Sequence, residues 1–203
     1  GIRSVAAEIP KMGLSAAVGI DITPMELLQG YMALANQGKS KEVFYWDKKK
    51  SSRREEFVFS PQATWLTSKA LRQKDRPDFA QRENYTQDSL YLAWKTGTSF
   101  GFHDAWSVGY TSDWVGLVWL GNLSYQSSSH LIGSKAAGPI LFDVMEGLYQ
   151  DTKEKHPPLP EPYGLSHFDV CAYSGLLPNE ACTHRERSVA KTKRSPTQVC
   201  PYH

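Results

Sequence analysis

The chain has 203 residues, of which 40% are apolar and 22% are charged. This composition suffices for one domain with a hydrophobic core, and the net charge of +2 gives no indication of a nucleic-acid partner. No apolar run is long enough to span a bilayer. The sequence starts with Gly1 in place of an initiator methionine and shows no signal-peptide pattern. We therefore expect it to be a piece of a longer polypeptide or a processed product.

Two segments in the first third of the chain carry helix-start signals. Thr23, Pro24 and Glu26 have the spacing of a threonine cap, a proline at the first helical position and the glutamate of a capping box. Apolar residues then recur at helical spacing, and Gly38 suits the left-handed position just past the helix. A serine–proline pair predicts a second helix over residues 60–73.

The segments around these helices predict short extended or irregular structure. We expect a short strand at residues 42–47. Residues 48–56 predict a solvated loop, because their lysines and arginines occur without a glycine or aromatic residue to organise an anion site. Residues 74–87 are polar and contain a proline, so they predict a loop that leads into the most informative stretch of the chain.

The stretch at residues 90–99 combines a strand pattern with a polar, glycine-containing end. A run rich in large apolar side chains ends in Lys-Thr-Gly-Thr-Ser at residues 95–99. Side chains two apart on a strand share a face, so Thr96 and Thr98 would lie together. A ligand carboxylate on that face would meet both hydroxyls, with the Lys95 ammonium close enough to favour its negative charge. The glycine marks a place where a ligand or another backbone comes close.

The string Lys-Thr-Gly-Thr also occurs at ordinary strand ends, so its context decides its meaning. A Walker loop needs its glycine before the lysine, and ion-pumping ATPases have a nucleophilic aspartate where this chain has Trp94. The third setting is the K-T-G strand of penicillin-binding proteins and serine β-lactamases. Residues 104–110 and 114–120 predict two more strands joined by the short turn 111–113, and this antiparallel meander favours the third setting.

The segments after the meander predict a loop, a helix and a linker. Residues 121–133 are polar and serine-rich, and Ser134 is placed to cap a helix whose apolar residues extend to Leu148. Pro139 lies in the first turns of that helix and predicts a late start or a kink. Residues 156–162 contain four prolines and predict a stiff linker at the main domain boundary.

The tail over residues 163–203 contains all three cysteines of the chain, Cys171, Cys182 and Cys200. One interpretation is a Cys171–Cys182 disulfide, with the partner of Cys200 lying beyond this chain. The other is a metal site, because Cys200 and His203 have C-x-x-H spacing and could join the other two cysteines as four tetrahedral ligands.

Residues 93–122 resemble the transpeptidase domain of class A penicillin-binding proteins, and most closely the penicillin-binding protein 1C type. The resemblance extends to residues 20–38 and 170–182 and covers most of the chain. It implies a mixed α/β (α+β) fold with an antiparallel sheet and flanking helices. In that fold residues 1–155 form the C-terminal half of the transpeptidase domain, and residues 163–203 form a small cysteine-containing tail. The resemblance also implies a protein of the periplasm or cell envelope, with an inner-membrane anchor expected only in the full-length protein. Thiols oxidise in that compartment, so the resemblance favours the disulfide over the metal.

The resemblance assigns roles only to positions that match the K-T-G motif. Lys95 would hold the serine of a proton shuttle and attract the substrate carboxylate, which the hydroxyls of Thr96 and Thr98 would bind beside Ser99. The Thr98 N–H would be one oxyanion donor, so Lys95 and Thr98 are the candidate catalytic residues. Gly97 would let the acyl carbonyl approach the strand. The implied ligands are the D-Ala-D-Ala end of a peptidoglycan stem peptide and β-lactams, with no cofactor.

Four further residues near the motif are interpreted as structural. His103 and Asp104 resemble an acid–base pair, but the family places no catalytic pair there, so we expect a turn into the next strand. Trp94 and Trp106 are expected to pack in the core or at its rim.

Two elements of such an active site are missing from the sequence. S-x-N does not occur, and the only S-x-x-K begins at Ser188, downstream of the K-T-G strand rather than upstream, so it is interpreted as a chance match. Without a nucleophile and its base the chain alone is predicted to be inactive and to need the missing N-terminal half of the domain. The alternative is a non-catalytic module of the same fold that binds peptide carboxylates or a partner protein. An upstream S-x-x-K and S-x-N would identify the enzyme.

Overall fold

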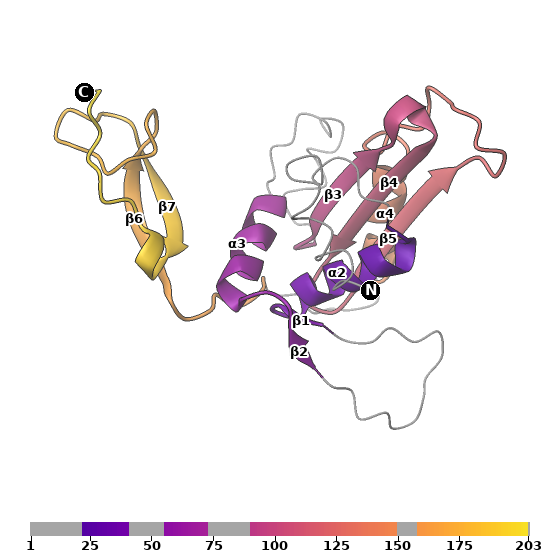
Figure 1. The fold of residues 1–203 in the computed structure, drawn as a ribbon, viewed down its shortest axis with the longest axis horizontal. Helices are drawn as coiled ribbons and strands as arrows, with labels where there is room; N and C mark the ends of the chain where they lie inside the picture. Colours follow the sequence, from indigo (N-terminus) through magenta and orange to yellow (C-terminus); the bar gives the residue numbers. More distant parts are fainter. Residues whose placement is uncertain (1–21, 41–54, 73–89, 150–157, 203) are drawn as a thin grey trace. The chain divides into compact units, whose positions relative to one another are not determined.

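The computed structural model describes residues 22–40, 55–72, 90–149 and 158–202 (Figure 1). The chain divides into two compact units, Gly1–Leu159 and Pro160–His203, and the division falls within the proline-rich segment. The first unit contains a three-stranded antiparallel sheet with helices, and the second contains a two-stranded antiparallel hairpin. This is the mixed α/β (α+β) architecture expected from the sequence.

Both predicted N-terminal helix starts are present. In α2 (Pro24–Ala35) the capping box is complete: the Thr23 hydroxyl accepts the Glu26 N–H, and the Glu26 carboxylate accepts the Thr23 N–H. In α3 (Pro61–Leu71) the Ser60 hydroxyl accepts a backbone N–H of the first turn at 3.2 Å. Local capping chemistry therefore sets where both helices begin.

The connection between these helices differs in detail from the prediction. Gly38 has a φ of +91°, the left-handed conformation expected after the helix. It leads into β1 (Lys39–Ser40), which pairs antiparallel with β2 (Glu56–Phe57). The strand predicted at residues 42–47 lies outside the described residues, as does the loop predicted at residues 74–87.

The predicted meander is confirmed. β3 (Ala93–Thr98), β4 (Asp104–Tyr110) and β5 (Val115–Gly121) form an antiparallel sheet in the order β3-β4-β5. The bounds of β4 agree with the prediction, whereas β5 begins one residue later than predicted and β3 occupies only part of residues 90–99. A short 3-10 helix, η3 (Phe100–Phe102), joins β3 to β4.

One face of the sheet packs against α4 (Ala137–Gly147), which lies behind the strands in Figure 1. Trp94 meets Phe142 edge-to-face at 5.1 Å, and its buried neighbours in this core are Leu92, Leu141 and Met145. The predicted cap at Ser134 is wrong, because the helix begins at Ala137 and has no side-chain cap. The late start agrees with the position of Pro139.

The opposite face is covered at one end by α2 and α3, through the buried side chain of Tyr110. Its ring meets Tyr31 of α2 edge-to-face at 5.9 Å, and its hydroxyl lies 2.6 Å from the Ser68 hydroxyl of α3. Because the Ser68 O–H donates to the Thr64 carbonyl at 2.8 Å, the Tyr110 O–H must be the donor to Ser68. Ionised Tyr110 would lose that hydrogen bond.

This arrangement predicts a loss of stability at alkaline pH. Burial raises the pKa of Tyr110 to about 12, above its ordinary value of 10.0. The neutral phenol is favoured in the folded chain, so its contribution is intact below pH 10 and is lost as the pH rises toward 12. The two pKa values correspond to about 2–3 kcal/mol of unfolding free energy. Urea unfolding between pH 8 and pH 12 would measure this loss.

The matched control for this experiment is Tyr110→Phe, which keeps the ring and removes the ionisable hydroxyl. We expect the variant to start from a lower stability, because the hydrogen bond to Ser68 is gone. Its stability should then fall less steeply than that of the unmodified chain above pH 10. Parallel curves for the two proteins would contradict the assignment to Tyr110.

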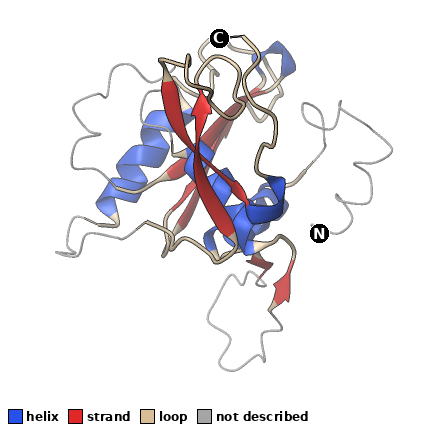
Figure 2. Cartoon of the chain, turned by 90° about the vertical axis from the view of Figure 1, so that its left-hand side faces the viewer, coloured by secondary structure: helices blue, strands red, loops and turns tan. Residues whose placement is uncertain are grey.

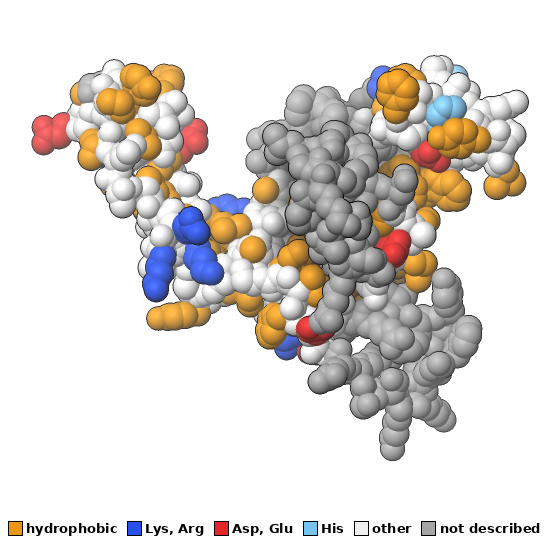
Figure 3. All heavy atoms as spheres, viewed as in Figure 1, with side chains coloured by type: hydrophobic (Ala, Val, Ile, Leu, Met, Phe, Trp, Pro, Cys, Tyr) orange, Lys and Arg blue, Asp and Glu red, His pale blue; other side chains and the backbone are white. Residues whose placement is uncertain are grey.

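The second unit is built on a hairpin of β6 (Leu165–Cys171) and β7 (Arg185–Lys191), followed by the short 3-10 helix η4 (Thr192–Arg194) (Figure 2). Large hydrophobic side chains lie on the surface of this unit, as the orange side chains in Figure 3 show. Tyr163 and Tyr202 are among the exposed ones.

Candidate active-site strand

The K-T-G motif lies on β3, which is an edge strand of the three-stranded sheet among the described residues. Lys95, Gly97 and Thr98 are exposed, and Thr96 and Ser99 are half-buried. The motif therefore occupies an accessible strand edge in the structure. It is neither in a helix nor buried in the core, and a ligand can reach it from outside the sheet.

The hydrogen bonds of β3 determine which backbone groups face this edge. The Ser99 N–H donates to the Asp104 carbonyl at 3.0 Å, so the main-chain groups of Ser99 are directed toward β4. Along a strand these directions alternate from residue to residue, so the backbone groups of Thr98 and Thr96 point toward the unpaired edge. The Thr98 N–H thus lies where an incoming ligand oxygen could accept its hydrogen bond.

The side chains of the motif divide between the two faces of the sheet. Thr96 and Thr98 alternate with the core residue Trp94 and share its face, on the side of α4. Lys95 pairs with Val108 and lies on the other face, the side of Tyr110. The shared face of the two threonines is as predicted. What the structure adds is that α4 covers the face of the hydroxyls, whereas Lys95 lies on the face of Tyr110.

Thr98 has a partner that sequence reasoning missed. Its hydroxyl oxygen accepts the backbone N–H of Gly133 at 3.0 Å. A Cβ atom at Gly133 would lie 2.3 Å from the carbonyl oxygen of Gly97 and 2.9 Å from that of Trp106. Only a glycine lets the loop before α4 lie this close to β3. The glycine is separated from the motif by many residues, so no local pattern could have identified it.

Lys95 and Gly97 shape the edge of β3 at which a ligand would bind. The Lys95 ammonium donates to the neighbouring Thr96 carbonyl at 2.6 Å, one of the groups that point outward from the strand. A Cβ atom at Gly97 would meet only the Cβ of Trp106, at 3.6 Å, among the described residues. The open face of Gly97 is therefore compatible with the close approach of a ligand that the sequence suggested.

The neighbouring polar and aromatic residues are structural, as expected. The Nδ1 atom of His103 is 2.8 Å from the carbonyl oxygen of Tyr125, and the two rings stack at 4.1 Å. Asp104 instead accepts the indole N–H of Trp119 at 2.9 Å. His103 and Asp104 thus have separate partners. Trp106 lies beside Trp119, with ring centroids 5.7 Å apart, and packs as predicted.

The single S-x-x-K sequence has the wrong local structure for a nucleophile and its base. Ser188 and Lys191 both lie in β7, where residues three apart point to opposite faces. On a helix the same spacing would bring the two side chains together. The interpretation of this match as chance is therefore supported by the structure.

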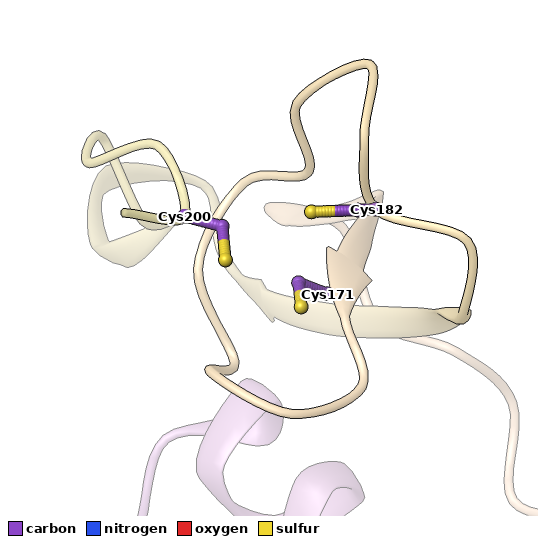
Figure 4. Close-up of side chains that lie close together, drawn as sticks. All are labelled: Cys171, Cys182 and Cys200. Carbon is purple, nitrogen blue, oxygen red and sulfur yellow. The ribbon is translucent and has the colours of Figure 1, made fainter. Parts of the chain in front are cut away.

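The three cysteines converge in the second unit (Figure 4). Their sulfur atoms all lie within 4.8 Å of one another, and Cys171, Cys182 and Cys200 are buried. The structure contains all three as thiols, so the Cys171–Cys182 disulfide favoured earlier is not formed. His203, the fourth member of the predicted metal set, lies outside the described residues.

Comparisons with known proteins agree with this geometry. Residues 7–146 match the family model described as the penicillin binding protein transpeptidase domain. Penicillin-binding protein 1A of Clostridium perfringens is 29% identical over 154 residues, which cover 72% of this chain and 18% of that protein. Penicillin-binding protein 1C of Escherichia coli is 31% identical over 80 residues, which cover 39% of this chain and 10% of that protein.

A solved structure shows the same fold. The crystal structure of penicillin-binding protein 1A from Haemophilus influenzae aligns with a TM-score of 0.72 at 18% identity, covering 88% of this chain and 33% of that one. The chain thus spans a third or less of the length of these relatives. Within the described ranges, no helix has the length and apolar character needed to cross a membrane. By its family match and its K-T-G strand, the chain belongs to the transpeptidase domain family of penicillin-binding proteins.

Proposed function

We propose that this chain supplies the K-T-G strand of a serine D,D-transpeptidase that cross-links peptidoglycan stem peptides in the periplasm or cell envelope. The observation that carries the proposal is that β3 is an edge strand among the described residues, with the outward-pointing Thr98 N–H beside an exposed lysine. An edge strand can pair with an extended peptide through its main chain. The C-terminal D-Ala-D-Ala segment of a stem peptide, or a β-lactam that resembles it, has the carboxylate that such an edge would bind.

In the proposed binding mode each motif residue acts on one part of the substrate. The ammonium of Lys95 attracts the terminal carboxylate and the hydroxyls of Thr96 and Thr98 bind it, with Ser99 next in line. The Thr98 N–H donates to the carbonyl oxygen that becomes negative during acylation. Gly97 leaves room for the acyl group against the strand. The hydrogen bond from Gly133 to Thr98 holds that residue in place.

The chemical step needs a serine that this chain does not supply. A serine oxygen would attack the carbonyl carbon between the two D-Ala residues, and its proton would pass to the leaving amine as the C–N bond breaks. An amine of a second stem peptide would then attack the ester, form the cross-link and restore the serine hydroxyl. No S-x-N occurs, and the only S-x-x-K lies in β7, so the nucleophile and shuttle serine must come from other sequence.

A labelling experiment tests this proposal. The chain alone, incubated with a fluorescent penicillin, should give no covalent band on a denaturing gel, because binding groups without a nucleophile leave only residual catalysis. A polypeptide that carries the same chain after upstream S-x-x-K and S-x-N segments should be labelled on the S-x-x-K serine. An adduct mapped to any serine of this chain would overturn the proposed division of the active site.

The same experiment separates the enzyme from a non-catalytic module of this fold. If the natural polypeptide has no upstream S-x-x-K and is not labelled, yet binds an acyl-D-Ala-D-Ala peptide reversibly, the chain is a carboxylate-binding module. Reversible binding that Thr98→Val weakens would place the peptide on β3. A peptide that binds equally to this variant would exclude β3 as its site.

A further inference from the structure

The interior of the second unit consists almost entirely of its cysteines. Its buried apolar side chains, among the described residues, are Val170, Cys171, Cys182 and Cys200, and the three cysteines form a separate buried cluster. A unit of this size is close to the limit of about 40 residues below which folded domains usually need a disulfide, a metal or a partner chain. A cross-link at the cysteine cluster would stabilise the one buried cluster among the described residues of this unit.

The geometry of the cluster suits a metal ion. Zinc–thiolate bonds of about 2.3 Å in a tetrahedral site separate the sulfur atoms by about 3.8 Å. The three sulfurs here lie within 4.8 Å of one another, and Figure 4 shows their side chains converging from three separate segments. Three thiols cannot all be paired among themselves, whereas three thiolates need only one more ligand to complete a tetrahedron. In the sequence, Cys200-Pro201-Tyr202-His203 has the C-x-x-H spacing that can provide it.

We propose that Cys171, Cys182 and Cys200 bind a structural Zn²⁺ ion. The C-x-x-H spacing of the sequence makes His203, which lies outside the described residues, the candidate fourth ligand. Thiolate-rich tetrahedral sites select zinc among the common divalent ions, and Cys₃His is one of its recurring structural ligand sets. The site is remote in sequence from the K-T-G strand and independent of the transpeptidase proposal.

The backbone around each cysteine is fixed by hydrogen bonds that would orient the ligands. Cys171 begins a tight turn in which its carbonyl accepts the Gly175 N–H at 2.8 Å, and Gly175 has a φ of +70°. The Cys200 N–H donates to the Leu177 carbonyl at 2.8 Å, which pins the C-terminal segment to the loop after β6. These bonds hold the first and third ligand segments together.

Asn179 links the remaining ligand segments. Its side-chain oxygen accepts the Cys182 N–H at 3.1 Å, and its amide donates to the Cys200 carbonyl at 3.0 Å. The guanidinium of Arg185 binds the carbonyl oxygens of Cys182 and Asn179, each at 3.0 Å, and brings a positive charge beside the cluster. Three thiolates and one Zn²⁺ carry a net negative charge, which this guanidinium would partly offset.

The first test measures metal content and thiol state on the full chain. After reduction and dialysis against zinc, we expect one Zn²⁺ per chain by elemental analysis. Under denaturing conditions after zinc removal, all three cysteines should react with a thiol reagent. A chain that takes up no zinc, or one isolated two hydrogens lighter with a single reactive thiol, would overturn the proposal in favour of the disulfide.

The second test identifies the ligands. Replacement of any one of the three cysteines by serine should lower zinc affinity at least tenfold, and His203→Ala should do the same. The matched control is His184→Ala in the same unit, because His184 instead contacts the Thr183 hydroxyl and the ring of Tyr173. Equal zinc affinity in His203→Ala and His184→Ala would exclude His203 as the fourth ligand.

A third measurement does not depend on whether a cysteine-to-serine variant folds. Cys200→His keeps four donor groups, so it should still bind Co²⁺, with weaker sulfur-to-cobalt charge-transfer absorption than the unmodified chain. Removal of the metal should also accelerate hydrogen exchange in β6 and β7 and leave exchange in β3, β4 and β5 unchanged. Unchanged cobalt absorption in Cys200→His, or unchanged exchange in the hairpin, would contradict the assignment.

Discussion

Replacing Lys95 by alanine should reduce acylation by β-lactams about 10²- to 10³-fold, in a polypeptide that also carries the S-x-x-K and S-x-N segments. The side chain is exposed at the edge of β3 and is the one cation of the motif. Its removal takes away both the attraction for the substrate carboxylate and the donor that would hold the shuttle serine. Acylation rates with a fluorescent penicillin, measured under single-turnover conditions, would report the loss.

One control variant and one stability measurement make this result specific. Lys193→Ala removes the same charge from an exposed position in η4 of the second unit and should leave acylation unchanged. Unfolding by urea should show equal stability for Lys95→Ala and the unmodified protein, because the exposed Lys95 side chain contributes little to packing. An acylation rate within about twofold of the unmodified protein would remove Lys95 from the proposed site.

Gly133→Ala should damage both the fold and the site, although this glycine lies outside the motif. The new Cβ would lie 2.3 Å from the Gly97 carbonyl oxygen, a backbone atom that cannot rotate away. We expect a loss of about 1–3 kcal/mol of unfolding free energy from overpacking. Displacement of β3 by about 1 Å should also lower acylation about 100-fold in the complete protein.

The matched control is Gly147→Ala at the last position of α4, where no described atom lies within 4 Å of the added Cβ. Because this position ends the helix, the change should raise stability by less than the roughly 1 kcal/mol expected inside a helix. The two substitutions add the same methyl group. Changes of opposite sign in the free energy of unfolding would therefore isolate the contact between Gly133 and β3. A neutral Gly133→Ala variant with normal acylation would show that the loop can move without disturbing Thr98.

Much of the first unit could be predicted because its signals are local. The capping residues Thr23 and Ser60 compete for backbone N–H groups within one turn, so they mark a helix start in any context. The start of α4 was mispredicted at Ser134 because a serine can cap only if the chain turns helical directly after it. The turns before Ala137 delay the helix, and no side chain caps it.

The arrangement of the K-T-G motif on β3 could be predicted only in part. Alternation predicts that Thr96 and Thr98 share a face, and the structure bears this out. The same alternation puts Lys95 on the other face of the strand. Sequence alone could not show which of the two faces α4 covers, and that choice is made by the burial of Trp94 against Leu141 and Met145.

The amino-acid sequence by itself determined the helix starts, the antiparallel meander and the position of the K-T-G string, because each depends on interactions between residues close together in the chain. Only the tertiary structure decided that Gly133 supports Thr98 and that Cys171, Cys182 and Cys200 meet at one point. Contacts between distant segments depend on the whole path of the backbone, which the packing of helices and strands fixes and which no spacing of residues encodes.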